Sequence, residues 1–292
     1  MAVEARARVP QAAEAGTRGG LRLALPGSVW LALFFMLPLA IMLVVSLLSL
    51  GARKTIVMPF TFANYERVLS ALYLPTIWDS IWISLLTTFV CLLIGYPLAF
   101  FISTRQSSFM RQFTLFLVIL PFWTNFVVRT YAMQTLLARE GVINELLLSL
   151  GLIDQPLEML YTQGAVIAGL VYGYLPFMVL PIYATAERFD FKLVAAAHDL
   201  GANDWKAIWR IVIPLTLPGV IAGVILVFIP CLGAFVTPEL LGGTSTLMIG
   251  NLINSQFEES NYPRGSALSI TLMALVLISL LLYARFAARE RR

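Results

Sequence analysis

The chain has 292 residues, of which 59% are hydrophobic and only 12% are charged, whereas soluble domains carry about 25% charged residues. This composition excludes an ordinary soluble protein and indicates a membrane protein. The net charge of +4 comes from basic residues scattered over several loops, so it does not indicate a nucleic-acid-binding protein.

Taken in chain order, residues 1–25 are rich in Ala, Arg and Glu, which predicts a loose cytoplasmic N-terminal tail. Residues 26–292 are expected to form a single transmembrane domain. It contains six apolar runs, each of roughly the 20 residues that cross a hydrocarbon core of about 30 Å. The sequence therefore predicts an all-α, polytopic membrane protein with six transmembrane helices. The runs lie near residues 27–50, 80–103, 112–137, 164–186, 210–235 and 266–286.

Basic residues are distributed unevenly between the two sides of the predicted membrane. With the N-terminus inside, 14 of the 20 lysines and arginines lie in cytoplasmic segments, 5 lie in outer loops and Arg129 lies within a span. This asymmetry follows the positive-inside rule and predicts that both termini and the 187–210 loop are cytoplasmic. Because a charge inside a membrane is costly, we expect Arg129 to pair with an acid of this chain or of a partner.

Two outer segments have features of their own. Residues 139–160 contain several leucines interspersed with acidic residues, which predicts an amphipathic helix at the outer membrane interface. Residues 236–265 contain prolines and paired glycines and look too irregular to face lipid. Such a segment must be buried in protein or line an aqueous cavity.

The sequence contains no motif that indicates catalysis or metal binding. It has no G-x-x-x-x-G-K phosphate loop and a single histidine, His198, while Cys91 and Cys231 lie in apolar segments. We therefore expect no enzyme and no cofactor bound by this chain. The energy for any transport must come from another subunit or from an ion gradient.

The 187–210 loop is a polar island between two apolar runs. Asp190 is placed to cap a short helix, and Gly201 can end it because glycine adopts left-handed dihedrals without a Cβ clash. Asn203 or Asp204 can then cap a second helix that leads into the membrane. The loop is thus predicted to be a short exposed helix followed by a hinge. Its apolar face would be Leu193, Ala196, Ala197 and Leu200.

This loop resembles the coupling loop of ABC importer permeases, which has the pattern E-A-A, three residues, Gly, nine residues, I-x-L-P. Two positions depart from the pattern, with Ala195 in place of Glu and Ile213 in place of Leu. The resemblance implies a coupling helix that inserts into a groove of an ATPase subunit; the alternative is an ordinary amphipathic loop. The implied coupling residues are Leu193, Ala195, Ala196, Ala197, His198, Asp199, Leu200 and Gly201.

Several further motifs resemble the spermidine/putrescine ABC permease family, first-permease type, over roughly residues 27–287. They are LIGYP at 93–97, LPFWTN at 120–125, GLVY at 169–172, LPFM at 175–178 and ELLGG at 239–243. The resemblance implies the type I ABC importer permease fold in a bacterial inner membrane. It also implies a sister permease, two ATPase subunits that use ATP, and an extracytoplasmic substrate-binding protein. Import of another small organic solute, or a gradient-driven carrier, are the alternatives.

A path for a polycation requires aromatic faces and a few acidic or carbonyl oxygens that are kept away from lipid. Aromatic residues near the motifs could instead serve packing or the membrane interface, and Glu239 could be a solvated loop acid. The candidate path residues are Trp123, Asn125, Tyr131, Tyr172, Tyr174 and Glu239.

Overall fold

The computed structural model describes residues 15–51, 54–190 and 192–290. Apart from one two-stranded antiparallel hairpin, the regular elements of these residues are helices. In chain order they are α1 (Ala15–Ser46), β1 (Ser49–Leu50), β2 (Ile56–Val57), α2 (Ala63–Val68), α3 (Leu74–Ser103), α4 (Ser108–Ile119), the 3₁₀ turn η2 (Leu120–Trp123), α5 (Phe126–Leu137), α6 (Val142–Ser149), α7 (Gln163–Ala186), α8 (Lys192–Asp199), α9 (Asp204–Ala207), the π turn η3 (Ile208–Val212), α10 (Ile213–Leu232), the π turn η4 (Pro238–Gly242), α11 (Ile249–Glu258) and α12 (Tyr262–Glu290).

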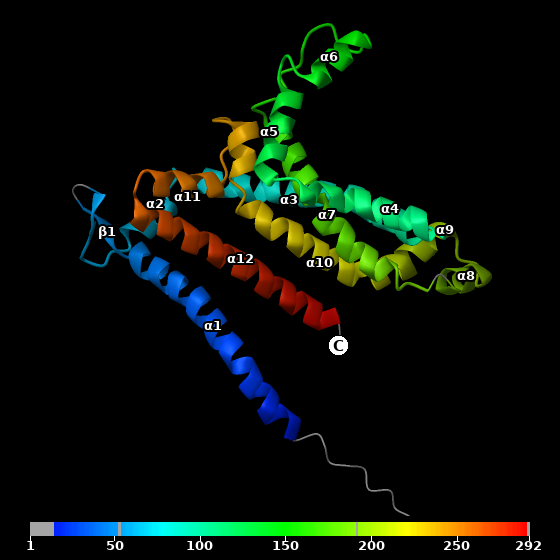
Figure 1. Ribbon diagram of the computed structural model, residues 1–292, viewed down its shortest axis with the longest axis horizontal. Helices are drawn as coiled ribbons and strands as arrows, with labels where there is room; N and C mark the ends of the chain where they lie inside the picture. The colour runs from blue at the N-terminus through cyan, green and yellow to red at the C-terminus, as the bar shows by residue number, and fades with distance from the viewer. Residues whose placement is uncertain (1–14, 52–53, 191, 291–292) are drawn as a thin grey trace, which may run out of the picture.

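Three long helices, α3, α7 and α10, form the centre of the molecule and pack against one another (Figure 1). Gly219 and Gly223 of α10 lie one helical turn apart, and a Cβ at Gly223 would lie 2.7 Å from the sulfur of Met178. Small residues at this spacing let membrane helices approach closely. Buried side chains of all three helices fill the contact: Cys91, Ala99, Val171, Met178, Ile182 and Val227.

The first and last helices pack against each other beside this centre. Helix α12 packs against both α1 and α11, while Figure 1 shows α1 diverging from the bundle towards its N-terminal end. The apolar stretch of α1, Leu25–Ser46, includes 18 consecutive residues of which none is buried. The outer surface of α1 is therefore left for lipid or for another subunit.

The six predicted spans correspond to five continuous helices and one broken pair. The continuous ones are α1, α3, α7, α12 and the run from α9 through α10. The third predicted span, expected as one helix over 112–137, is corrected by the structure: it consists of two helical segments, Ser108–Trp123 and Phe126–Ser149, bent by 96°. The first helix also begins earlier than expected. It starts at Ala15, inside the predicted 1–25 tail, and residues 1–14 lie outside the described residues.

The break in the third span has a local cause. Pro121 lacks an N–H and starts the 3₁₀ turn, after which Thr124 adopts an extended conformation with ψ 146°. Asn125 then starts a new helix, because its Oδ1 accepts hydrogen bonds from Val127 N at 2.8 Å and Val128 N at 3.5 Å. Helices α5 and α6, named here the α5–α6 arm, consequently project away from the bundle (Figure 1).

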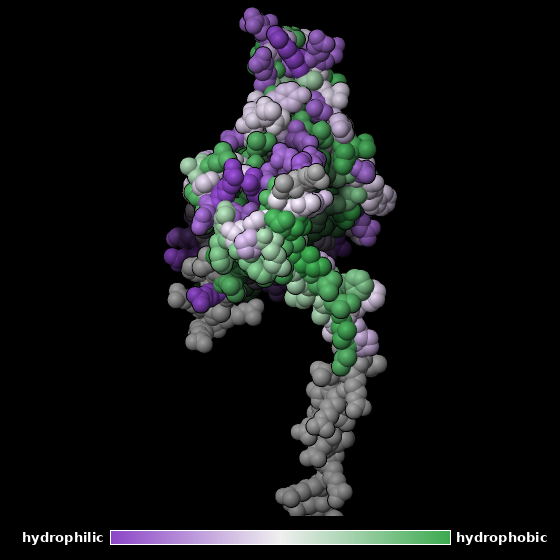
Figure 2. Space-filling model, turned by 90° about the vertical axis from the view of Figure 1, so that its left-hand side faces the viewer, coloured by the Kyte–Doolittle hydropathy of each residue, from purple (hydrophilic) through white to green (hydrophobic). Residues whose placement is uncertain are grey.

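The outer segments are more regular than the sequence suggests. The amphipathic helix expected within 139–160 is present as α6, but its position at the membrane interface stays a prediction. The 236–265 segment is largely helical, as η4, α11 and the start of α12, and its residues Pro238, Leu241 and Asn251 are buried in protein. Hydrophilic residues gather at the β1 end of the bundle and at the tip of the α5–α6 arm (Figure 2).

Candidate functional site

Local hydrogen bonds fix the shape of the 187–210 loop. Asp190 Oδ1 accepts from Lys192 N at 3.0 Å and begins α8. At the other end Gly201 has φ +81°, its N–H donates to His198 O at 2.9 Å, and Ala202 N donates to Ala197 O at 2.9 Å. This pair of bonds is the Schellman motif that ends many helices.

The second helix of the loop is capped as the sequence predicts. Asn203 Oδ1 accepts from Lys206 N at 2.9 Å and starts α9. Helix α9 continues through the π turn η3 into α10, so the loop and the fifth span form one unit. The position of the loop is therefore tied to the membrane helix that follows it.

Helix α8 presents most of its predicted face to solvent. Leu200 is 88% exposed and Leu193 is 46% exposed. Ala197 is the exception, because it is buried where α8 packs against α9 and η3. The expected apolar face therefore has two parts. Ala197 packs inside the loop, whereas the other residues of the face are exposed to solvent. The exposed members of the predicted set are Leu193, Ala195, Ala196, His198, Asp199, Leu200 and Gly201.

A contact across the hinge was not foreseen from the sequence. His198 Nε2 lies 3.1 Å from Asp204 Oδ1, so the last turn of α8 is joined to the first turn of α9. Both side chains are exposed, which limits the energy of the contact. A basic residue in a last turn and an acid in the next first turn also suit the two helix dipoles, and this pattern is the signal that could have predicted the pair.

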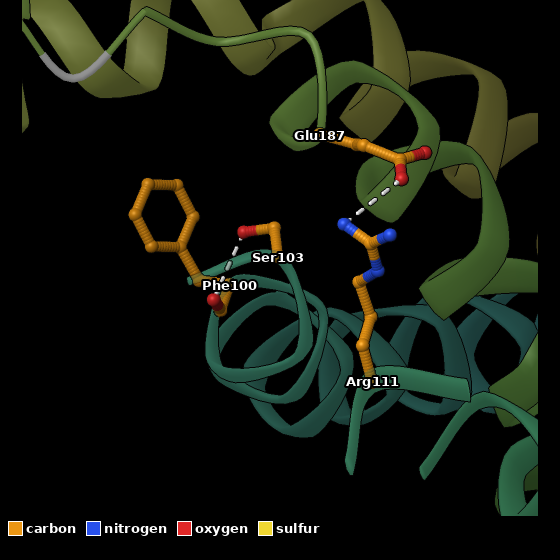
Figure 3. Close-up of polar contacts among 4 residues, drawn as sticks. All are labelled: Phe100, Ser103, Arg111 and Glu187. Carbon is orange, nitrogen blue, oxygen red and sulfur yellow. Dashed lines mark hydrogen bonds and ion pairs between the residues drawn. The ribbon is translucent and has the colours of Figure 1, made fainter. Parts of the chain in front are cut away.

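An ion pair ties the start of the loop to the bundle. Arg111 of α4 lies 3.6 Å from Glu187, the residue that follows α7 (Figure 3). Nearby, the Ser103 hydroxyl donates to Phe100 O at 2.9 Å near the end of α3. The ends of α3, α4 and α7 thus meet on the side of the molecule that carries α8.

The candidate path residues are divided between several surfaces. Trp123 is 75% exposed and contacts Phe116 edge to face, with ring centroids 5.7 Å apart. Tyr131 of α5 and Tyr172 of α7 are 53% and 44% exposed. The Tyr174 side chain is directed towards α10, where its hydroxyl donates to Pro230 O at 3.3 Å. The structure therefore does not bring all the aromatic candidates to one cavity.

Arg129 is placed at the break in the third span. Its guanidinium donates to Pro121 O at 3.0 Å and lies 5.4 Å from the ring centroids of Phe126 and Tyr172. Among the described residues no acid pairs with it, so the expected partner within this chain is not found. A carbonyl and two aromatic faces take the place of that acid.

The two remaining polar candidates differ in their freedom to meet a solute. Asn125 already uses its side-chain oxygen to cap α5. Glu239 lies in η4, which packs against both α5 and α7, and its side chain is exposed. Of the two, Glu239 has the carboxylate that is free to receive an ammonium group.

Comparison with known proteins identifies the family. Residues 92–292 match the model of the binding-protein-dependent transport system inner membrane component. The chain belongs to this family. It is 43% identical to the spermidine/putrescine transport system permease protein PotB of Haemophilus influenzae, over 88% of this chain and 90% of that protein. The PotB protein of Escherichia coli is also 43% identical, over 88% of this chain and 93% of its own length.

Solved structures confirm the fold. A bacterial ABC transporter that imports the acidic polysaccharide alginate contains a chain with a TM-score of 0.70 and 19% identity, covering 94% of this chain and 98% of that one. The alginate transporter in complex with a pentasaccharide-bound periplasmic protein gives a TM-score of 0.72 at 19% identity, covering 94% and 96%. The expected all-α importer permease fold is thus confirmed, while identity at this level carries no information about cargo.

Proposed function

We propose that this chain is the permease subunit of an ATP-driven importer that takes up polyamines such as spermidine and putrescine. The similarity to the two PotB proteins, at 43% identity over 88% of the chain, supports this cargo. In this proposal a sister permease completes the path, and an extracytoplasmic binding protein delivers the polyamine. Two ATPase subunits supply the energy, since the sequence has no phosphate loop of its own.

The observation that carries the coupling proposal is the exposure of α8. Leu193, Ala196 and Leu200 lie on one face of the loop at helical spacing and are all exposed, with Leu200 88% exposed. An exposed apolar face of this kind marks an interaction surface. The ATPase subunit is the partner whose docking covers Leu200. The loop and both chain termini then lie in the cytoplasm, as the distribution of basic residues also indicates.

Substitution of Leu200 tests this docking directly. Leu200→Asp places a charge in an apolar contact, which costs several-fold to a hundredfold in affinity. The ATPase should then be lost when the tagged complex is purified. Lys192→Asp introduces the same aspartate at an exposed position of α8 outside the implied coupling residues, and it serves as the matched control that should retain the ATPase. Retention of the ATPase and full ATP-coupled uptake by Leu200→Asp would show that α8 is not the docking element.

A further inference from the structure

An apolar groove runs along α3 and α10 on the side of the α8 loop. It has a volume of about 400 Å³, and its lining is almost entirely hydrocarbon. Residues that line it include Phe89, Leu93, Tyr96, Trp209, Ile213 and Leu217. The groove is thus suited to a flexible apolar chain and offers few hydrogen-bonding groups to a polar solute.

The π turn η3 aligns the groove with two tryptophans. Trp205, Trp209, Ile213 and Leu217 follow one another at intervals of four residues. In a regular α-helix such a row drifts around the axis, but the wider π turn over Ile208–Val212 reduces the drift. Trp205 and Trp209 lie with their ring centroids 5.8 Å apart, at the end of the groove nearest α8. Exposed tryptophans at the end of a span mark the headgroup level of a bilayer.

Two basic residues lie next in sequence to these tryptophans, one of which, Trp209, lines the groove. Lys206 and Arg210 each follow one of the tryptophans in sequence, are exposed, and form no ion pair with another described residue. The nearest loop acid, Asp204, is already paired with His198. Two free cations beside an apolar groove at headgroup level are complementary to a lipid with a phosphate headgroup.

We propose that this groove binds an anionic phospholipid of the leaflet on the α8 side. One acyl chain lies along α3 and α10, and the headgroup phosphate contacts Lys206 and Arg210. Within a bilayer an acyl chain gains little from leaving other acyl chains, so the headgroup contacts decide which lipid is bound. The bound lipid would rest against the helix that continues into the α8 loop, and its charge would set the position of that loop at the membrane surface.

Native mass spectrometry of the purified complex tests this site. With phosphatidylglycerol and phosphatidylcholine of identical chains, we expect retained adducts of the first and few of the second. Lys206→Gln combined with Arg210→Gln should lower the preference for phosphatidylglycerol by up to roughly 30-fold. Arg188→Gln combined with Lys192→Gln removes two exposed basic residues of the same loop away from the groove, and should leave the preference unchanged. Equal retention of both lipids by the unaltered complex would overturn the proposal.

A second measurement identifies what occupies the groove itself. Leu217→Trp fills it and should reduce lipid adducts while Lys206 and Arg210 remain in place. A photoreactive p-benzoylphenylalanine at position 217 should form a phospholipid adduct in native membranes. A crosslink to the sister permease instead would show that the groove is a subunit contact, and would overturn the lipid site without affecting the proposed transport function.

Discussion

Gly201 shows how one backbone conformation shapes the exposed end of α8. Its φ is +81°, and a Cβ built there would meet no atom within 4 Å. Crowding is therefore not the reason for glycine at this position. The left-handed conformation is the reason, because a β-branched residue pays a penalty there whatever the space around it.

Substitution of Gly201 separates these two explanations. Gly201→Val should strain the Schellman turn by about 1–3 kcal/mol and misplace Leu200. Gly201→Asn keeps a side chain but tolerates the left-handed region, so it should preserve function. Co-purification of the ATPase with each variant is the measurement. Equal loss in both variants would point to crowding by a partner and not to the backbone.

We expect Glu239, whose side chain is exposed, to meet the cation at the outer end of the proposed transport path. We expect Glu239→Gln, which keeps the shape and removes the charge, to weaken polyamine uptake about fivefold or more, since hydrogen bonds to charged groups contribute about 1–3 kcal/mol. Uptake measured over a range of polyamine concentrations tests this. Glu258→Gln, at an exposed acid of α11, is the control, and unchanged uptake by Glu239→Gln would make Glu239 a solvated loop acid.

At the scale of elements, the break in the third span depends on Arg129. The Pro121 carbonyl in η2 accepts from the Thr124 N–H at 3.3 Å and from the Thr124 hydroxyl at 2.8 Å. The Arg129 guanidinium adds a third, charged donor at 3.0 Å. A cation near a helix C-terminus is also favoured by the helix dipole. Arg129, a cation that would repel a polycationic solute, thus stabilises the break between the two halves of the third span.

Replacement of Arg129 tests this assignment. Arg129→Leu removes the charged donor to the Pro121 carbonyl, which keeps its bonds from Thr124, and also removes the contacts with the Phe126 and Tyr172 rings, so it should lower stability by about 1–2 kcal/mol. Arg129→Lys keeps the charge and one donor and should recover part of the loss. Thermal unfolding of the purified complex in detergent measures both. A lysine variant no more stable than the leucine variant would indicate that the charge and its contact with Pro121 are unimportant.

The sequence predicted elements that depend on local patterns and missed those that depend on contacts. Span positions follow from apolar runs, and the caps at Asp190 and Asn203 follow from side chains adjacent to their helices. The 96° bend was missed because only two polar residues, Thr124 and Asn125, interrupt the apolar run around it, and so short an interruption does not divide a span by hydropathy. The burial of Ala197 was missed because it requires the fold of the loop, which a sequence pattern does not contain.

At the scale of the whole molecule, two large surfaces are not covered by the rest of the described chain. The apolar stretch of α1 is uncovered, and the α5–α6 arm extends from the bundle. In the proposed transporter, lipid or the sister permease covers the apolar stretch of α1. The orientation of these surfaces follows from the proposed topology.

Cysteine labelling tests that topology. In a background without Cys91 and Cys231, a cysteine at Ser107 or Ala196 should be protected from an impermeant thiol reagent outside intact cells. A cysteine at Ser149 should react, because it lies at the exposed end of the α5–α6 arm. Labelling of position 196 from outside would reverse the orientation and remove the basis for ATPase docking.

Uptake by the reconstituted complex tests the central claim most directly. The permease pair and the ATPase are placed in vesicles with ATP inside, and the loaded binding protein is added outside. We predict that spermidine or putrescine accumulates, that accumulation requires both ATP and the binding protein, and that unrelated solutes are not taken up. ATP-dependent uptake of another solute without polyamines, or polyamine uptake driven by an ion gradient without ATP, would contradict the proposed function.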